Sequence, residues 1–343
     1  ADIDKLTKLE WLFINNALEG TIPASIGSLT SLKILRIDQD TTSFGKGSLT
    51  GPIPIEIGNL SSLNQLHITN QNLNGNIPST INNLTELREF VVYGNQLSGN
   101  LPAISLPNLG YLKLNGNLFS EFDEGLGNCP NLILIELQNN QIIGDIPSYF
   151  GNFTTLKTLN LSDNQIESLP EEIGNLIQLE SFTIDNNQLK ALPNGIALPV
   201  NLKHLSASNN QIAYLPSNFA QSGSLETLDL SNNKITSIPE EIGNCPNLYQ
   251  ILLNNNRIDS IPATFANLRD GVTVLLNDNE MQGKIPEELM TATAKNNKHV
   301  RIDGNRFVFD DIPNSEQLRF GVRNQKDVLL KKQLYLVQIG DTI

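Results

Sequence analysis

The sequence is poor in the features by which many functional classes are recognised. Its 343 residues contain two cysteines, three histidines and only 6% aromatic residues. No apolar run reaches the roughly eighteen residues that a membrane-spanning helix needs, so we expect no membrane insertion. The first ten residues, ADIDKLTKLE, lack the basic start and apolar stretch of a signal peptide. We expect that such a peptide is either absent or removed before this numbering begins.

The charge balance also narrows the classes of partner. Lysine and arginine number 23 against 36 aspartates and glutamates, which gives a formal net charge of −13. Residues 291–343 hold nine basic and six acidic residues, so the preceding 290 residues carry −16. Nucleic acids and anionic lipid surfaces bind basic faces. We therefore expect no nucleic-acid partner and a solvated acidic surface.

A repeat of 23 or 24 residues runs through most of the chain. Residues 59–84, 152–176 and 244–268 follow the pattern L-x-x-L-x-x-L-x-L-x-x-N-x-L, then x-G-x-I-P or x-x-L-P, then x-x-I-G-N-L. In the first three of thirteen turns the Asn position holds Ala17, Asp40 and Gln71. The other ten turns have Asn95, Asn117, Asn140, Asn164, Asn187, Asn210, Asn233, Asn256, Asn279 and Asn305. We predict about thirteen stacked turns with a less regular N-terminal end.

Each part of the repeat has a physical explanation. The alternating L-x-L segment predicts a short strand with one face in the core, and stacked strands form a parallel sheet. The asparagine amide donates and accepts, so a column of asparagines can satisfy buried backbone groups. Proline then fixes φ where the chain turns back. Glu-Glu pairs follow at 171–172, 240–241 and 287–288, where a short helix is expected to begin. A helix dipole favours acidic side chains at this end, so we interpret the pairs as helix starts and not as catalytic carboxylates.

This pattern resembles the leucine-rich repeats, over residues 6–313. The resemblance implies an α/β fold, a right-handed horseshoe solenoid with a parallel sheet on the concave face and short helices or 3-10 turns on the convex face. LEGTIP, LTGPIP, LNGNIP and IIGDIP resemble plant-type repeats, whereas IESLPEEIGNL and ITSIPEEIGNC resemble the shorter bacterial and intracellular type. The mixture is most similar to secreted or surface-anchored bacterial proteins, because the paired-cysteine caps of plant ectodomains have no counterpart here.

We predict two parts in the chain. Residues 1–313 form the solenoid, whose last turn, HVRIDGNRFVFDDIP, ends at Pro313. Residues 314–343 are basic, contain no repeat and end in an alternating segment, KKQLYLVQIGDTI, that is typical of a strand. This segment is expected either to cap the last turn or to begin a following immunoglobulin-like β domain.

The cysteines and histidines are too widely spaced to form a reactive or metal site. Cys129 and Cys245 stand in identical GNCPNL segments five turns apart, about 24 Å at the spacing of stacked strands and beyond the reach of a disulfide. His67, His204 and His299 fall in turns three, nine and thirteen. No metal site or Ser-His-Asp set can assemble from such positions, so we expect no cofactor and no enzyme.

Outward strand residues line the concave face, where solenoids bind partners. Turns one to five place aromatic and charged residues there, the types that dominate binding interfaces, whereas the middle turns place serine and threonine. The candidate ligand-binding residues are Trp11, Phe13, Arg36, His67, Tyr93, Tyr111 and Lys113. The aromatic residues would supply apolar contact, and Arg36 and Lys113 would orient an acidic or hydroxyl-rich group. For Trp11 and Phe13 the alternative is that an N-terminal cap covers them.

One turn carries an insertion of about seven residues, within DQDTTSFGKGSLTG at 38–51. Long loops cost little stability, because closure entropy grows only logarithmically with length. We predict a loop at the rim of the concave face, with Phe44 and Lys46 as ligand contacts; the alternative is a neutral decoration.

The sequence therefore favours a non-catalytic binding module of a secreted or surface protein, which recognises a protein, peptide or glycan with its N-terminal third. Adhesion would be one use of such a module, and we expect a monomer or weak self-association. Two alternatives stay open. The repeats could act as a spacer or self-association unit of a multi-domain surface protein, or as an intracellular scaffold.

Overall fold

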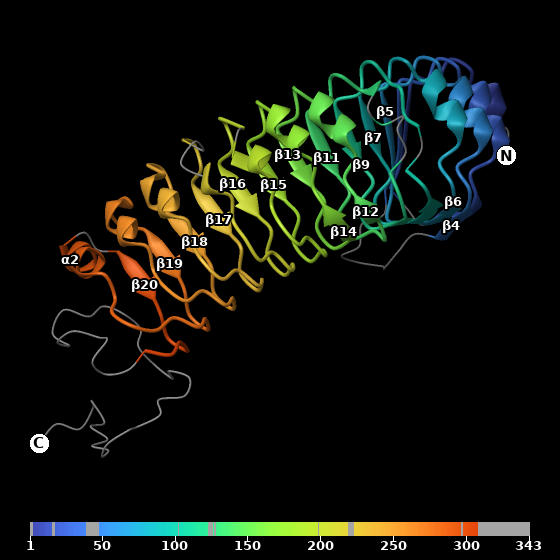
Figure 1. Ribbon diagram of the computed structural model, residues 1–343. Helices are drawn as coiled ribbons and strands as arrows, with labels where there is room; N and C mark the ends of the chain where they lie inside the picture. Colours follow the sequence, from blue (N-terminus) through green and yellow to red (C-terminus); the bar gives the residue numbers. More distant parts are fainter. Residues whose placement is uncertain are drawn as a thin grey trace, which may run out of the picture.

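The computed structural model is an elongated, curved stack of turns (Figure 1). It describes residues 3–15, 18–38, 48–101, 103–122, 126, 128–197, 199–218, 223–295 and 298–307. Phe44, Lys46 and the predicted boundary at Pro313 with the segment 314–343 lie outside these residues. The predicted α/β solenoid is confirmed: each turn adds one strand to a large sheet, and most turns add a short helical segment to the opposite side.

The large sheet has thirteen strands, which are all parallel and follow one another in chain order. Between some of them the chain forms strands of smaller sheets. Each strand coincides with an L-x-L segment of the repeat, whose alternate leucines point into the core. The strands are β1 (Trp11–Ile14), β3 (Ile34–Asp38), β5 (Gln65–Thr69), β7 (Glu89–Val91), β9 (Tyr111–Lys113), β11 (Leu134–Glu136), β13 (Thr158–Asn160), β15 (Ser181–Thr183), β16 (His204–Ser206), β17 (Thr227–Asp229), β18 (Gln250–Leu252), β19 (Thr273–Leu275) and β20 (His299–Arg301).

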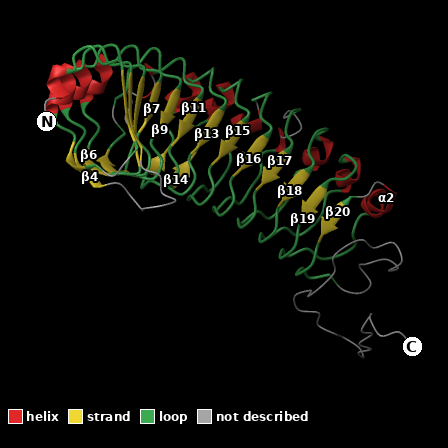
Figure 2. Cartoon of the chain, turned by 180° about the vertical axis from the view of Figure 1, so that it is seen from behind, coloured by secondary structure: helices red, strands yellow, loops and turns green. Residues whose placement is uncertain are grey.

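Short helical segments line the side of the stack away from this sheet (Figure 2). The Glu-Glu pairs begin three of them, as predicted, and Glu171 also accepts hydrogen bonds from the backbone N–H groups of Asn194 and Gly195 in the next turn. The 3-10 segments are η1 (Ile3–Lys5), η2 (Ala24–Ser28), η3 (Ile55–Asn59), η4 (Ser79–Asn83), η6 (Ser148–Asn152), η7 (Glu171–Asn175), η8 (Asn194–Ala197), η10 (Glu240–Asn244) and η11 (Ala263–Asn267), and the α-helix is α2 (Glu287–Lys295).

Two smaller parallel sheets form where the chain leaves the large sheet in the N-terminal half. One has the order β10-β8-β6-β4-β2 and the other pairs β12 with β14. Most of these strands contain the glycine of the x-G-x-I-P segment, and Gly51, Gly75 and Gly99 have positive φ. Their bounds are β2 (Glu19–Thr21), β4 (Ser48–Gly51), β6 (Asn72–Gly75), β8 (Gln96–Gly99), β10 (Leu118–Phe119), β12 (Ile143–Asp145) and β14 (Gln165–Ser168).

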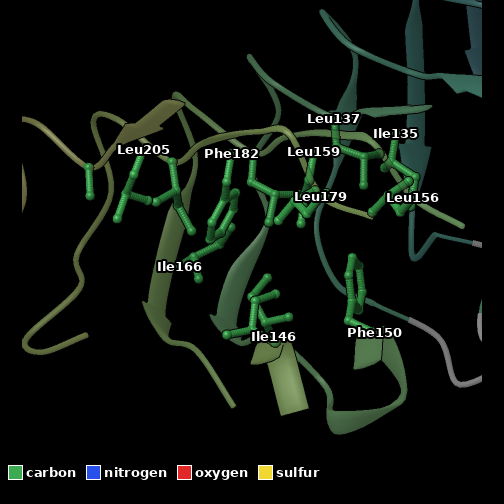
Figure 3. Close-up of a cluster of buried hydrophobic side chains, with 14 of the residues drawn as sticks. Ile135, Leu137, Ile146, Phe150, Leu156, Leu159, Ile166, Leu179, Phe182 and Leu205 are labelled. Carbon is green, nitrogen blue, oxygen red and sulfur yellow. The ribbon is translucent and has the colours of Figure 1, made fainter. Parts of the chain in front are cut away.

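A continuous apolar core fills the space between the large sheet and the helical segments. Figure 3 shows part of it, where leucines and isoleucines of successive turns pack around Phe150 and Phe182. Cys129 and Cys245 are buried in this core and both are free thiols. Burial raises the pKa of both thiols, that of Cys245 to about 11, so they are packing groups at neutral pH.

A column of asparagine side chains joins each turn to its neighbours. The Asn164 amide donates to the carbonyl oxygens of Leu137 in the preceding turn and Leu161 in its own, and its oxygen accepts the backbone N–H of Ile142. The same bonds recur from Asn95 to Asn305. The residue before each of these asparagines has positive φ and is Asn, Asp or Gly, the types that tolerate this backbone region.

The column begins one turn earlier than the sequence predicts. Gln71 is fully buried and takes over part of the asparagine role: its oxygen accepts the backbone N–H of Leu49 at 3.3 Å, whereas its amide donates to Thr69. The column is therefore not broken at this turn, but its bonding is less regular than in the turns that follow. Ala17 and Asp40 lie outside the described residues.

Replacement of Asn164 by alanine tests this column. Three backbone groups lose their buried partner, so the free energy of unfolding should fall by roughly 2–4 kcal/mol. Urea unfolding followed by circular dichroism measures the change. Asn175→Ala, at an exposed asparagine of η7, is the control and should change the free energy by less than about 0.5 kcal/mol. Equal effects of the two substitutions would contradict the bridging role.

Candidate functional site

The strand register brings the predicted site residues onto one face of the large sheet. Along the first outward column, Trp11, Ile34, Gln65, Glu89 and Tyr111 lie side by side on successive strands. The second column holds Phe13, Arg36, His67, Val91 and Lys113 in the same strands. Tyr93 follows β7 by two residues, so it belongs to a third column that also contains Asp38 and Thr69.

A groove of about 730 Å³ lies across these strands. Four of the predicted residues line it: His67, Tyr93, Tyr111 and Lys113. The remaining lining residues are Asn15, Asp38, Thr69, Glu89 and Val91. We call this cavity the N-terminal groove. Its lining comes from turns one to five, which are far apart in sequence and meet only because the turns stack.

Glu89 organises the polar part of the N-terminal groove. Its two carboxylate oxygens accept hydrogen bonds from the His67 ring Nε2 and the Gln65 amide, both at 2.9 Å. The Gln65 oxygen in turn accepts from the Arg36 guanidinium at 2.8 Å. On the other side of His67, Asp38 accepts the Thr69 hydroxyl at 3.0 Å. Each of these bonds joins two turns, so the groove has a preset polar surface.

His67 is held as a neutral imidazole in this network. Burial is the largest cause that lowers its pKa below the ordinary value of 6.5, and the neighbouring Arg36 charge lowers it further. The hydrogen bond that His67 donates to Glu89 and the charges of Glu89 and Asp38 oppose the shift without reversing it. Because Nε2 donates to Glu89, the other ring nitrogen of the neutral form is an acceptor.

The two predicted cations both have partners within the chain. The Lys113 ammonium lies 3.2 Å from a Glu136 carboxylate oxygen of the next strand. Arg36 lies with its guanidinium carbon 6.0 Å from the centre of the Phe13 ring, in addition to its bond to Gln65. Arg36 does not line the N-terminal groove among the described residues but supports its edge.

Trp11 and Phe13 lie beside the groove rather than in it. Their side chains are 60% and 55% exposed on β1, the edge strand of the large sheet. They form an apolar shelf next to Asn15, the groove residue of the same turn. The Arg36 guanidinium lies over the Phe13 ring, yet both aromatic residues stay largely exposed.

Sequence reasoning missed Asn15, Asp38, Thr69, Glu89 and Val91 as groove residues. Each occupies an outward position of the same columns, so the period alone places it on this face. Val91 could not be recognised, because an outward residue is expected to be exposed and its side chain is only 6% exposed. It gives the groove an apolar floor between His67 and Lys113.

The serine- and threonine-rich middle of the sheet satisfies its own hydrogen bonds. Asp185 accepts the Ser206 hydroxyl at 2.6 Å and the Ser208 backbone N–H at 2.7 Å. Asp229 accepts both the hydroxyl and the backbone N–H of Ser231. These turns form a polar surface whose hydroxyl groups bond within the sheet.

The described residues carry no group of three His, Cys, Asp or Glu side chains that could hold a metal ion. His204 and His299 lie on β16 and β20, far along the sheet from His67. Within the described ranges, none of the helices has the length and apolar character needed to cross a membrane.

Comparison with known families agrees with this geometry. Residues 130–189 match the model described as leucine rich repeat, and residues 223–268 match the model described as leucine rich repeats in two copies. The chain therefore contains leucine-rich repeats in these two segments and folds as a leucine-rich-repeat solenoid. A comparison with curated protein sequences gives no match.

Solved structures of leucine-rich-repeat proteins resemble this one over 89% of the chain at 28% identity. They include the plant peptide hormone receptor RGFR1 in complex with RGF2 (TM-score 0.76), PEPR1–AtPEP1 (0.79) and a leucine-rich-repeat protein of Leptospira interrogans (0.73). The chain spans 53% and 43% of the first two proteins and 75% of the third.

Titration of His67 by NMR tests the electrostatics of the N-terminal groove. Its midpoint should lie below 6.5. Arg36→Gln should raise the midpoint by removing a positive charge, and Glu89→Gln should lower it by removing a negative one. A midpoint above 6.5, or shifts in the opposite order, would contradict the network.

The lowered pKa also has a consequence for stability. The unfolded chain binds a proton at His67 at higher pH than the folded chain does. Stability from this group is therefore complete above about pH 6.5 and is lost as pH falls through the lower folded pKa. The pH dependence of urea unfolding, compared between the parent chain and His67→Gln, measures this loss.

Proposed function

We propose that this leucine-rich-repeat chain is a non-catalytic binding module that holds a protein or peptide segment in the N-terminal groove. The observation that carries the proposal is the groove itself, in which side chains of five turns form a hollow with an apolar floor and a preset polar network. Ligand sites are typically concave, with a few oriented polar groups. The solved complex of a plant peptide hormone receptor at 28% identity supports a peptide as the ligand class.

The predicted residues take different parts in this proposal. Tyr93 and Tyr111 supply rigid aromatic contact area at the groove, and tyrosine is a frequent hot-spot residue. Trp11 and Phe13 extend the contact area over the edge strand, where a larger ligand rests. Arg36, His67 and Lys113 position the polar groups around them. We place the module at the cell surface or outside the cell, which the similarity to a hormone receptor supports.

Selection from a library of random displayed dodecapeptides tests the proposal. Peptides selected on the parent chain should bind at least about tenfold more weakly to Tyr93→Ala/Tyr111→Ala, because hot-spot truncations cost more than about 1.4 kcal/mol. Tyr214→Ala/Tyr249→Ala is the matched control, since these exposed tyrosines lie outside the groove. Binding should stay within about twofold there.

Selection that yields no binder would contradict peptide recognition by this chain. Binders that are unaffected by the groove substitutions would move the site elsewhere. The first result would favour the alternative in which the repeats act as a spacer.

A further inference from the structure

We propose that the ligand of the N-terminal groove presents a lysine or arginine side chain, which contacts Tyr93 and Tyr111 and pairs with the carboxylates of Asp38 and Glu89. The inference rests on the proposed function and names the chemistry that the same groove selects. It differs from the expectation, drawn from the sequence, that Arg36 and Lys113 orient an acidic or hydroxyl-rich group.

The two carboxylates of the groove have only neutral hydrogen-bond donors around them. Glu89 accepts from the Gln65 amide and from the neutral ring of His67, and Asp38 accepts from the Thr69 hydroxyl. Within the described part of the chain, neither carboxylate forms an ion pair with a lysine or arginine. These donors orient the carboxylates without adding a positive charge to them.

The lysine and arginine side chains nearby have other contacts within the chain. Lys113 lines the groove but pairs with Glu136, and Arg36 is bonded to Gln65 and lies over the Phe13 ring. His67 stays neutral because burial lowers its pKa. An anionic ligand would meet two carboxylates here, whereas a cationic side chain would compensate them.

Each carboxylate has a tyrosine close by in the sheet. Tyr111 lies next to Glu89 in the strand register. Tyr93 stands one turn beyond Thr69, the residue that donates to Asp38, and its carbonyl oxygen accepts the backbone N–H of Asn70. Ammonium and guanidinium groups bind the faces of aromatic rings, and arginine does so while it donates to a carboxylate. Carboxylate and aromatic ring together therefore favour a basic side chain over a neutral one.

The charge of the whole solenoid acts in the same direction. The first 290 residues carry −16, so a basic segment is attracted toward the acidic body before contact. This general attraction would act on a basic peptide at any part of the acidic surface and would not direct it to the N-terminal groove. The test must therefore separate local pairing from general attraction.

The peptides selected on the parent chain provide the first readout. Lysine and arginine should be enriched among them relative to the unselected library. Enrichment of aspartate and glutamate, or no enrichment of basic residues, would overturn the inference.

A double-mutant cycle provides the second readout. Each arginine of a selected peptide is replaced by citrulline, which keeps the shape and removes the charge. The replacement at the contacting position should weaken binding to the parent chain by about tenfold. The same replacement should have little effect, within about twofold, on binding to Asp38→Asn/Glu89→Gln. If the two losses simply multiply, the arginine does not pair with these carboxylates and the inference is wrong.

Asp185→Asn/Asp229→Asn is the matched control for net charge. It removes two carboxylates from the same sheet, outside the N-terminal groove. The citrulline effect should persist in full on this variant. Equal loss of the effect on both double variants would mean that only the overall charge attracts the peptides. If binding of the selected peptides needs Tyr93 and Tyr111 but no basic residue of the peptide is coupled to the two carboxylates, only this inference fails. If no selected peptide needs the tyrosines for binding, the proposed function fails as well.

Discussion

The hydrogen bonds between the asparagine column and the backbone are the constraint on which the rest of the structure depends. A turn of this repeat leaves backbone groups inside the protein where the chain departs from the large sheet, and such groups are costly when unpaired. Asn95, Asn117 and their equivalents satisfy them by bonding to two turns at once. Each turn therefore completes its neighbour, and stability grows with the stack rather than within one turn.

The same constraint builds the N-terminal groove. Because the turns stack with constant register from β1 to β9, outward side chains of five turns meet in columns. The contacts between columns then set their roles: Glu89 ties His67 to Gln65, and Glu136 holds Lys113. Farther along, Asp185 accepts a hydrogen bond from a serine of the adjacent turn, and Asp229 accepts one from a serine of its own turn. Similar strands therefore form a groove near the N-terminus and a polar surface with its own hydrogen bonds in the middle of the sheet.

Most of the fold follows from the repeat, whereas only part of the site does. The L-x-L spacing located the thirteen strands because alternation determines which side chains enter the core. Gln71 escaped recognition because its longer side chain reaches the equivalent backbone N–H, that of Leu49, by another geometry. The partners of Glu89 are 22 and 24 residues away in sequence, so they follow only from the register and the side-chain conformations. The buried state of Val91 likewise depends on surrounding side chains that no period encodes.

Amide hydrogen exchange of the native protein tests the central claim most directly. Four backbone amides that donate to asparagine side chains rather than to a strand are the reporters: Leu73, Leu97, Phe119 and Ile142. If the column joins the turns, these amides should exchange as slowly as those of the neighbouring strands of the large sheet, because opening them requires separation of two turns. Exchange at the rate of exposed turn amides would show that the asparagine column does not hold the stack together.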